Sequence, residues 1–354
     1  MPNDTATTRI PAARISDLIK RCLMAVDLPE ADAQITAGLM ADADLNGADG
    51  HGVFRLPGYI KRIRDGAVNP RPSIRIDREK AAMALIDGDN GMGHLVMKYA
   101  ADVAVEKARE CGVGWAGAHH SNHAGPAYLY AKMPMAADMI GLYVAVGSAN
   151  HLPPWGGTEM LLSTNPIAVA VPALDCPPII LDMATTVAAY GKVKTARQRG
   201  QQMPVGWMID KLGQPLTDPN RSDEGFLLPI GGPKGYGLSL IFGLLAGTLN
   251  GAAFGKDVVD FNADSTSVTN TGHFVVALDI KAFTDVEGFK ANVDAVVRTM
   301  KASPTLPGFD EVRLPGEQSF AKRQDYTDNG IPLHDTLLDV LAKTAADLGV
   351  DPLV

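Results

Sequence analysis

Short β-prone runs that alternate with helical segments constrain the fold of this 354-residue chain more than any other feature. The pattern starts near Ala82, and its first four segments are a strand at Met83–Ile86, a helix at Gly93–Cys111, a strand at Val113–Ala118 and a helix at Pro126–Ala137. Such alternation is typical of α/β proteins, in which helices cover the faces of a sheet. The sequence therefore predicts a large mixed sheet flanked by helices over about residues 76–304.

Further apolar runs extend this prediction along the chain. The additional elements are strands at Ile140–Val146, Ile167–Val171, Ile179–Asp182, Trp207–Ile209 and His273–Asp279, and helices at Gly235–Leu249 and Val286–Met300. Apolar residues at helical spacing predict helices at Pro11–Val26, from Pro29 to Asn46, and from Val53 to Gly66. An amphipathic helix at Pro332–Leu348 is expected to return to them. We expect a helical domain of residues 1–75 plus about 305–354.

Charge and cysteine content limit the classes of binding partner and the cellular compartment that the sequence predicts. Lysine and arginine total 32 and aspartate and glutamate total 40, which gives a formal charge of −8 without a basic tract. Nucleic acid and anionic membranes are therefore not expected, whereas a small carboxylate bound by one or two arginines is compatible. Three separated cysteines and the absence of an apolar signal core favour the cytoplasm. The apolar run Leu238–Leu249 is too short for a membrane span.

The segment Asp49–Arg55 is the first candidate for chemistry. Glycines on both sides of His51 allow a tight turn that exposes the imidazole, and Arg55 follows about one helical turn later. Histidine exchanges protons near neutral pH, and arginine binds a carboxylate through two parallel hydrogen bonds. The segment predicts an acid/base beside a carboxylate-binding group, although a helix-capping loop with surface side chains fits the same residues.

A second candidate is the histidine-rich segment between a predicted strand and a predicted helix. Its histidines are His119, His120 and His123, and such strand ends are where α/β proteins place ligand sites. Three histidines also raise the question of a metal. However, no carboxylate lies nearby in the sequence and adjacent side chains point in different directions. A hydrogen-bonded polar loop is the simpler interpretation, and we assign no metal ligand.

Two further segments carry candidate ligands. Asp182 ends the apolar run Pro178–Leu181, and a carboxylate buried there needs a partner such as a histidine, or acts as the N-cap of a following helix. The glycine-rich segment at residues 231–237 opens a predicted apolar helix, where backbone NH groups and Lys234 would meet a phosphate. A flexible turn is the alternative for this segment.

Several familiar motifs are missing. The sequence contains no Gly-x-Gly-x-x-Gly fingerprint, no Gly-Lys-Ser/Thr phosphate loop, no His-Glu-x-x-His and no Gly-x-Ser-x-Gly. The residues alone thus indicate an α/β enzyme without specifying its reaction.

In their order along the chain, these segments resemble the malate/L-lactate/sulfolactate dehydrogenase-like family, which is separate from the Rossmann lactate and malate dehydrogenases. The most specific similarities are His51-Gly52 with Arg55-Leu56-Pro57, Ser121-Asn122-His123 with Gly125, Trp155-Gly156-Gly157 with Thr164-Asn165-Pro166, Leu181-Asp182-Met183-Ala184, and Gly232-Pro233-Lys234-Gly235. The resemblance spans nearly the whole chain. It implies NAD or NADP as cofactor, bound by a non-Rossmann α/β domain, and a homodimer with sites between domains and subunits.

The resemblance also implies roles for individual residues. His51 and His123 are the candidate proton donors and acceptors, Arg55 holds the substrate carboxylate, and Asp182 polarises or orients the acid/base. Thr164 and Asn165 would line the pocket near the substrate. The implied cofactor contacts are His123, Ser148, Asp182, Met183, Ala184, Gly232, Pro233, Lys234, Gly235, Pro315, Gly316 and Glu317.

Two departures from the family pattern bear on the substrate. Gly50 stands where the family usually has serine, so a hydroxyl is lost and the substrate pocket gains room. His119 and His120 stand where Arg-Asn is common, and Ala124 replaces an aromatic residue. We interpret these changes as accommodation of a substrate other than plain lactate.

The leading hypothesis is reversible hydride transfer between NAD(P) and C2 of a small 2-hydroxy or 2-oxo acid, or of a cyclic imino acid. Oxidation of ureidoglycolate or a sugar acid on the same scaffold is the alternative. A metal-dependent lyase or hydrolase that uses His119, His120 and His123, and a non-catalytic binding protein, are hypotheses from other classes.

Overall fold

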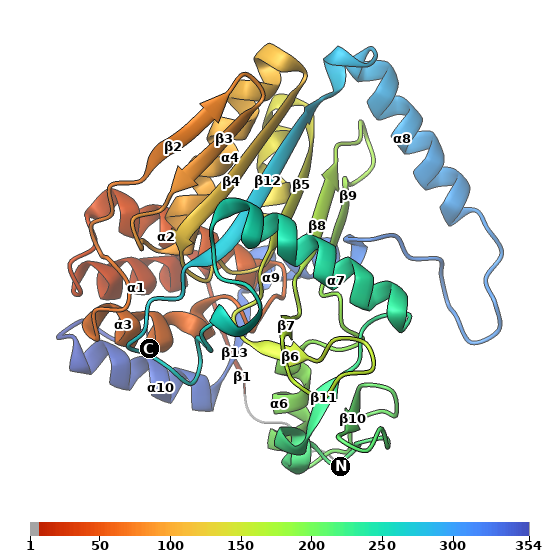
Figure 1. The fold of residues 1–354 in the computed structure, drawn as a ribbon. Coiled ribbons are helices and arrows are strands. Elements are labelled where there is room, and N and C mark those ends of the chain that lie inside the picture. The colour runs from red at the N-terminus through yellow and green to blue at the C-terminus, as the bar shows by residue number, and fades with distance from the viewer. Residues whose placement is uncertain (1–6, 354) are drawn as a thin grey trace.

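A mixed sheet forms the centre of the molecule, in a computed structural model that describes residues 7–353 (Figure 1). Within these residues the sheet has seven strands in the order β2-β3-β4-β12-β5-β8-β9. Their bounds are β2 Arg75–Lys80, β3 Met83–Asp87, β4 Val113–Ser121, β5 Met139–Ala145, β8 Ile167–Val171, β9 Ile179–Met183 and β12 Thr271–Asp279. Only β3 and β4 are parallel neighbours within this sheet. The predicted large mixed sheet is confirmed, and it differs from the parallel sheet of a Rossmann domain.

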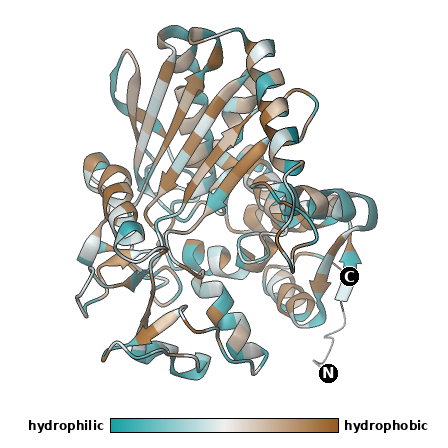
Figure 2. Cartoon of the chain, turned by 90° about the vertical axis from the view of Figure 1, so that its right-hand side faces the viewer, coloured by the Kyte–Doolittle hydropathy of each residue, from teal (hydrophilic) through white to brown (hydrophobic). Residues whose placement is uncertain are grey.

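Helices cover both faces of the sheet. Helices α4 (Gly93–Cys111) and α5 (Tyr128–Ala131) pack on one face through an alanine-rich core, and α7 (Pro233–Ala246) packs on the other. The close approach of α4 explains this composition, because a Cβ atom at Gly114 would lie 1.9 Å from the carbonyl oxygen of Ala104. In Figure 2 the strands between these helices carry much of the hydrophobic colour, as expected for a sheet that is covered on both sides.

A helical unit lies below one end of the sheet (Figure 1). It contains α1 Ala12–Met24, α2 Glu30–Leu45, α3 Leu56–Arg64, α9 Glu317–Asn329 and α10 Asp335–Asp347, with the antiparallel pair β1 Thr7–Ile10 and β13 Ile331–His334. Its core joins both ends of the chain, since Leu18 and Leu23 of α1 pack in one cluster with Leu338 and Leu341 of α10. The predicted return of the tail helix to the N-terminal helices is confirmed.

The tail nevertheless differs from the prediction at its start. The sequence predicts a helix from Pro332, but Ile331–His334 form strand β13, in which buried and more exposed residues alternate against β1. Proline interrupts helical hydrogen bonding and is tolerated in an edge strand, which explains the difference. Helix α9 is absent from the predicted elements because none of its residues is buried, so it carries no apolar periodicity.

Two predicted helices are shorter than expected. The segment Pro126–Ala137 forms α5 and then a separate 3-10 turn at Met133–Ala137, where Pro134 lacks the NH group that a continuous helix needs. Helix α7 ends at Ala246 instead of Leu249, because Gly247 leaves the helical conformation and a 3-10 turn follows.

A smaller unit lies between β5 and α7 in the sequence. It contains β6 Asn150–Leu152, β7 Leu162–Ser163, α6 Tyr190–Gln198, β10 Met208–Asp210 and β11 Gly225–Leu227. The strands form two separate two-stranded sheets, β6 with β7 and β10 with β11. Leu152, Met203, Met208 and Leu227 form its core.

Helix α8 (Val286–Lys301) stands away from the sheet in Figure 1. Its buried Asp294 accepts hydrogen bonds from the backbone NH groups of Leu174, Asp175 and Cys176 in the connection between β8 and β9. These bonds attach the helix to the sheet edge. Among the described residues, no helix has the length and apolar character required to cross a membrane.

Candidate active site

The loop that carries His51 is fixed by a buried carboxylate on α2. Asp44 accepts a hydrogen bond of 2.8 Å from the backbone NH of Val53, and a Cβ atom at Gly52 would lie 1.9 Å from its Oδ1. Burial raises the pKa of Asp44 to about 8, against the effect of the Val53 hydrogen bond. A side chain at position 52 would therefore displace the Asp44 carboxylate, which is the group that hydrogen-bonds the loop backbone.

His51 faces His123, which follows β4. The two imidazole rings are stacked with centroids 5.4 Å apart and an interplanar angle of 15°. The Nδ1 atom of His123 is hydrogen-bonded to the hydroxyl of Tyr59 on α3 at 2.6 Å. Nδ1 of His51 is buried and has no hydrogen-bond partner among the described residues. The structure thus brings together two histidines that are 72 positions apart in the sequence.

Both imidazoles are electrically neutral at neutral pH. Burial lowers the pKa of His51 to about 4, and the nearby positive charge of Arg55 contributes to the shift. Burial also holds the pKa of His123 well below 6.5, with further contributions from Arg55 and His51. A neutral imidazole has a lone pair that accepts a proton, which is the state a general base requires.

Arg55 lies at the side of this pair. Its Nε donates to the carbonyl oxygen of Gly50 at 2.8 Å, and its Nη1 donates to Oδ1 of Asn262 at 2.7 Å. Within the described residues, Nη2 has no hydrogen-bond partner. The adjacent Phe261 packs against the ring of His123 at 5.4 Å, and its backbone NH donates to the carbonyl oxygen of Ser148. Ser148 therefore lies beside the loop that borders the two histidines.

Buried polar residues support the His123 loop. The side-chain amide of Asn122 donates to the backbone of Asn90 and Gly91, and its backbone oxygen lies 3.2 Å from Nε2 of His273. His94 on α4 is fully buried and contacts the Tyr59 ring edge-on at 5.5 Å, while neither of its ring nitrogens has a partner among the described residues.

The residues of this cluster that sequence reasoning missed are Tyr59, His94, Phe261, Asn262 and His273. Only Tyr59 had a local signal, because it follows Arg55 by four residues and shares its helical face. The others come from distant segments.

Asp182 lies on the edge strand β9, and its partner differs from the expected one. Its Oδ2 accepts a hydrogen bond of 3.0 Å from the backbone NH of Tyr128, at the start of α5. Burial raises its pKa to about 6, opposed by the NH groups of Tyr128 and Ala127. The structure thus places two backbone donors at this carboxylate, and within residues 7–353 no histidine is hydrogen-bonded to it.

Thr164 and Asn165 form hydrogen bonds with neighbouring segments of the chain near the candidate site. Asn165 is fully buried, its Oδ1 accepts from the NH of Gly147, and its Nδ2 donates to Ser239. The carbonyl oxygen of Thr164 accepts hydrogen bonds from Thr185. The side chain of Asn165 thus hydrogen-bonds protein groups through both its oxygen and its nitrogen, and its contact with substrate stays a prediction.

The segments predicted to contact a cofactor lie along β9. The backbone NH of Ile180 donates to the carbonyl oxygen of Pro315, and a Cβ at Gly316 would lie 3.1 Å from Ile180 O. Met183 ends β9, and Ala184 leads to Thr185, whose carbonyl oxygen accepts a hydrogen bond from the NH of Ile230, just before the glycines that open α7. The carboxylate of Glu317 accepts hydrogen bonds from the backbone NH of Leu314 and from the side chain of Lys301.

Two glycines in the left-handed conformation precede the first turn of α7. Gly231 and Gly232 have φ angles of +58° and +64°, which glycine adopts without steric cost. A Cβ at Gly232 would lie 3.3 Å from the ring of Trp155, which is 55% exposed. Pro233 and Lys234 follow on the exposed first turn, whereas Gly235 packs tightly against Ile230. Backbone NH groups at such a helix start bind phosphate groups.

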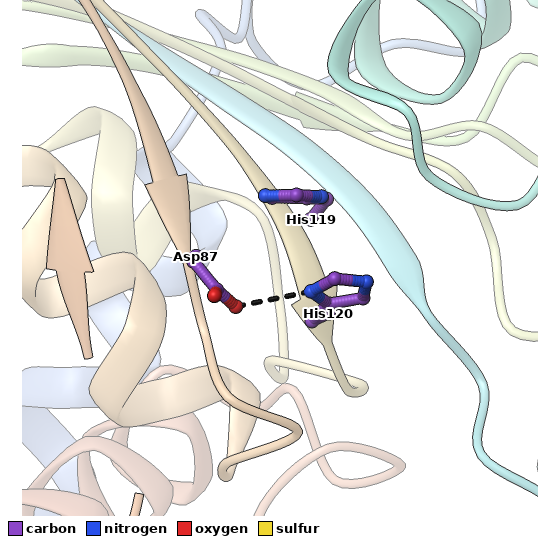
Figure 3. A group of neighbouring side chains, drawn as sticks. All are labelled: Asp87, His119 and His120. Atoms are coloured by element: carbon purple, nitrogen blue, oxygen red, sulfur yellow. Dashed lines mark hydrogen bonds and ion pairs between the residues drawn. The ribbon is translucent and has the colours of Figure 1, made fainter. Parts of the chain in front are cut away.

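The three histidines of the predicted metal alternative do not form one group. Among the described residues, the side chains placed to share an ion are Asp87, His119 and His120, and His123 is not one of them (Figure 3). No carboxylate lies near these histidines in the sequence, but the fold brings one to them, because the parallel pairing of β3 with β4 places Asp87 beside His119.

Comparisons with known proteins agree over the full length of the fold. A family model described as malate/L-lactate dehydrogenase matches residues 10–342. Malate dehydrogenase from Pyrococcus horikoshii is 38% identical over 353 residues, which cover 98% of this chain and 97% of the relative. A solved structure of malate dehydrogenase from that organism has a TM-score of 0.90 at 35% identity, covering 99% of this chain and 98% of the other.

Two further relatives have other substrates in their names. L-sulfolactate dehydrogenase from Methanocaldococcus jannaschii is 38% identical over 340 residues, 95% of each chain. A Delta(1)-pyrroline-2-carboxylate/Delta(1)-piperideine-2-carboxylate reductase from Pseudomonas putida is 30% identical over 341 residues, 96% of this chain and 98% of the relative. With the family model matched over most of its length, the chain belongs to the malate/L-lactate dehydrogenase family.

Proposed function

We propose that this protein catalyses reversible hydride transfer between NAD or NADP and C2 of a small 2-hydroxy or 2-oxo acid, or of a cyclic imino acid. The observation that carries the proposal is the stacked, neutral pair of His51 and His123 beside Arg55. Proton exchange at a hydroxyl or imine nitrogen requires such a base, and recognition of the adjacent carboxylate requires such a cation. The names of the three relatives refer to substrates that carry a carboxylate.

The residues divide the chemistry between them. In the oxidising direction, a neutral imidazole of the pair accepts the proton of the 2-hydroxyl, and the same nitrogen returns it during reduction. The Tyr59 hydroxyl fixes the ring of His123 through Nδ1, which leaves Nε2 as the atom available for substrate. Arg55 holds the substrate carboxylate with the part of its guanidinium that Gly50 and Asn262 do not use. The nicotinamide, when bound, accepts or donates the hydride.

The start of α7 fits the diphosphate of a dinucleotide. The backbone NH groups after Gly231 and Gly232 and the exposed Lys234 offer hydrogen bonds and positive charge to an anion. We infer that the segments at residues 183–184 and 315–317, which border the same edge strand, contact the rest of the cofactor. Asp182 then acts by position, holding the start of α5 near the nicotinamide end.

Gly50 is exposed and borders open space in the loop that carries His51. No atom lies within 4 Å of a Cβ atom built at this glycine, so the position tolerates a substrate group or an added side chain. We infer a substrate larger than lactate. A panel of 2-hydroxy acids, 2-oxo acids, cyclic imino acids, ureidoglycolate and sugar acids, read by NAD(P)H absorbance, would identify it.

The assignment of His51 and Arg55 is tested by two variants. His51→Ala is expected to lower kcat at least about 100-fold while NAD(P)H still binds, because general acid/base catalysis contributes that much. Arg55→Ala is expected chiefly to raise KM, because it removes the carboxylate contact. Steady-state kinetics and fluorescence titration with NAD(P)H measure both. Normal turnover of the His51 variant would contradict the assignment of His51 as acid/base.

We further propose that the protein is a cytoplasmic homodimer. Leu238, Ile241 and Leu244 lie at three-residue spacing on α7 and are 43%, 55% and 37% exposed, which is a large apolar face for a free surface. A second copy of the chain is the partner that family membership favours.

The free thiols of Cys22, Cys111 and Cys176 are consistent with a reducing compartment.

A further inference from the structure

His119 and His120 take no part in the proposed hydride transfer, yet the fold places them beside a carboxylate. Strands β3 and β4 run parallel, with Asp87 directly opposite His119. Figure 3 shows the three side chains together at the ends of these neighbouring strands. A carboxylate and two imidazoles thus lie together at the ends of two neighbouring strands. The loop that carries His123 begins at the same end of β4.

The backbone at His120 departs from regular strand geometry. Successive side chains of a strand normally point to opposite faces. His120 has a φ of +46°, in the left-handed region that non-glycine residues rarely adopt. As a result, both rings lie on the same side, stacked with centroids 4.2 Å apart and an interplanar angle of 24°. The side chain of Asn270 supports this conformation by accepting from the backbone NH of His120 at 2.7 Å.

The donor atoms of the three residues are close to the separation that a metal ion requires. One donor atom from each residue lies within 4.8 Å of the others, and Nδ1 of His120 is 3.0 Å from Oδ1 of Asp87. Nε2 of His119 is buried and has no hydrogen-bond partner among the described residues. Two donors bound tetrahedrally at zinc distances are about 3.3 Å apart, so small side-chain rotations complete the set.

We propose that Asp87, His119 and His120 form a binding site for one divalent transition-metal ion, with zinc as the best match. Two imidazole nitrogens and one carboxylate oxygen suit zinc and its neighbours, whereas magnesium and calcium prefer oxygen ligands alone. His120 is exposed, so water completes the fourth position. The site is separate from the proposed reaction, whose acid/base candidates are not among its ligands.

An ion at this site would connect loops that support the candidate active site. The backbone NH groups of Gly88 and Asn90 already donate to the carbonyl oxygens of His119 and His120. Asn90 and Gly91 in turn accept from Asn122, next to His123. A metal that binds only the folded chain stabilises it by mass action, so occupancy is expected to raise the thermal stability of the protein.

Arg75 competes with the proposed ion. Its guanidinium pairs with Oδ2 of Asp87, and its side chain is 56% exposed on the edge strand β2. The arginine supplies the positive charge at Asp87 in the metal-free protein, and it has room to move away. Removing it would relieve both the competition for Oδ2 and the repulsion of a second cation.

The first experiment measures zinc binding by competition with a chromophoric chelator and by calorimetry. We expect one tight site per chain in the wild type and its loss in the double variant His119→Gln/His120→Gln, with at least about tenfold weaker binding for each single change. His51→Gln is the control, because it removes an imidazole outside the site, and it should retain the stoichiometric binding. Equal zinc affinity of the wild type and the double variant would overturn the proposal.

The second experiment separates a metal site from a purely structural ion pair. Arg75→Gln should bind zinc several-fold more tightly than the wild type, and zinc should raise the melting temperature of both proteins but not of the double variant. If His119→Gln/His120→Gln folds poorly, Asp87→Asn and the Arg75 variant provide the same comparison. Weaker zinc binding in Arg75→Gln, or an equal thermal shift in all variants, would contradict the proposal.

Discussion

The hydroxyl of Tyr59 holds one member of the candidate acid/base pair. It is buried on α3, one helical turn after Arg55, and its 2.6 Å hydrogen bond to Nδ1 is the side-chain hydrogen bond that orients His123. Phe261 and His94 pack against the same tyrosine ring. In the proposed reaction, this hydrogen bond determines which nitrogen of His123 faces the substrate.

Replacing Tyr59 with phenylalanine tests this arrangement. Tyr59→Phe keeps the ring and removes the hydrogen bond, so kcat is expected to fall about 5- to 30-fold, equivalent to about 1–2 kcal/mol. The affinity for NAD(P)H should not change. Parallel measurements of kcat, of the pH profile and of cofactor binding provide the check, and an unchanged kcat and pH profile would show that the hydroxyl does not orient His123.

Buried histidines also link the stability of the protein to pH. Burial lowers the pKa of His94 to about 3 and that of His273 to about 4, both below the value of 6.5 expected in the unfolded chain. Between about pH 6.5 and 4 the unfolded chain therefore binds protons that the native state excludes, and stability is lost as the pH falls. Asp44 acts in the opposite direction, because its raised pKa makes the native state the better proton acceptor there.

A comparison of the wild type with His94→Gln isolates the effect of His94 on stability from these opposing effects. The free energy of unfolding of His94→Gln should depend less steeply on pH than that of the wild type, by up to about 1.4 kcal/mol per pH unit between about pH 6 and 4.5. Urea unfolding at several pH values measures both slopes. Identical slopes would mean that His94 titrates alike in the folded and unfolded chain.

At the scale of secondary structure, the contact of the His51 loop with α2 depends on one glycine. A methyl group at Gly52 would enter the Asp44 carboxylate, whereas a methyl group at Gly58 on α3 meets nothing within 4 Å. Gly52→Ala is expected to destabilise the protein by about 2 kcal/mol or more and to reduce turnover. Gly58→Ala should be neutral or slightly stabilising.

Thermal unfolding and kcat of the two glycine variants provide the comparison. Equal melting temperatures for Gly52→Ala and Gly58→Ala would show that the loop moves away from Asp44 at little cost. The same pair separates a local packing effect from a general effect of alanine, because both substitutions add one methyl group within seven residues of each other.

Elements with strong periodicity were predictable from the sequence, and elements without it were not. The predicted bounds of α4 and β8 agree with the structure, because both have regular apolar patterns. The short strands β6, β7 and β11 contain too few residues to show alternation, and α9 has no buried face. Strand β13 was predicted as helix because its partner β1 lies more than 300 positions away.

At the scale of the whole molecule, the candidate site joins segments that sequence proximity does not connect. His51 and Arg55 come from the helical unit, His123 from the loop after β4, and Asn262 from a loop before β12. Residue patterns already singled out the first three residues and the family resemblance gave them roles, whereas Asn262 lies in a polar loop without a recognisable motif. The hydrogen bond from Asn165 to Ser239 could not be predicted from the sequence either, because it depends on how α7 packs against the sheet.

The apolar face of α7 gives a prediction about assembly. Ile241→Glu places a charge in the centre of this face and is expected to convert a homodimer into monomers at micromolar concentration. Leu212→Glu is the matched control, because Leu212 is 85% exposed in a turn outside α7. Light scattering after size-exclusion chromatography measures the masses. A dimer that persists in Ile241→Glu would place the interface elsewhere.

The pairing of β1 with β13 has a consequence for synthesis on the ribosome. The core around α1 includes α10, so the unit that carries His51 and Arg55 is incomplete until residues 331–353 have left the exit tunnel. The strands of the sheet emerge before that point and are free to pair first. Nascent chains stalled after β12 are therefore expected to resist protease in the sheet while the region around His51 is still cleaved, so that the acid/base loop is assembled last.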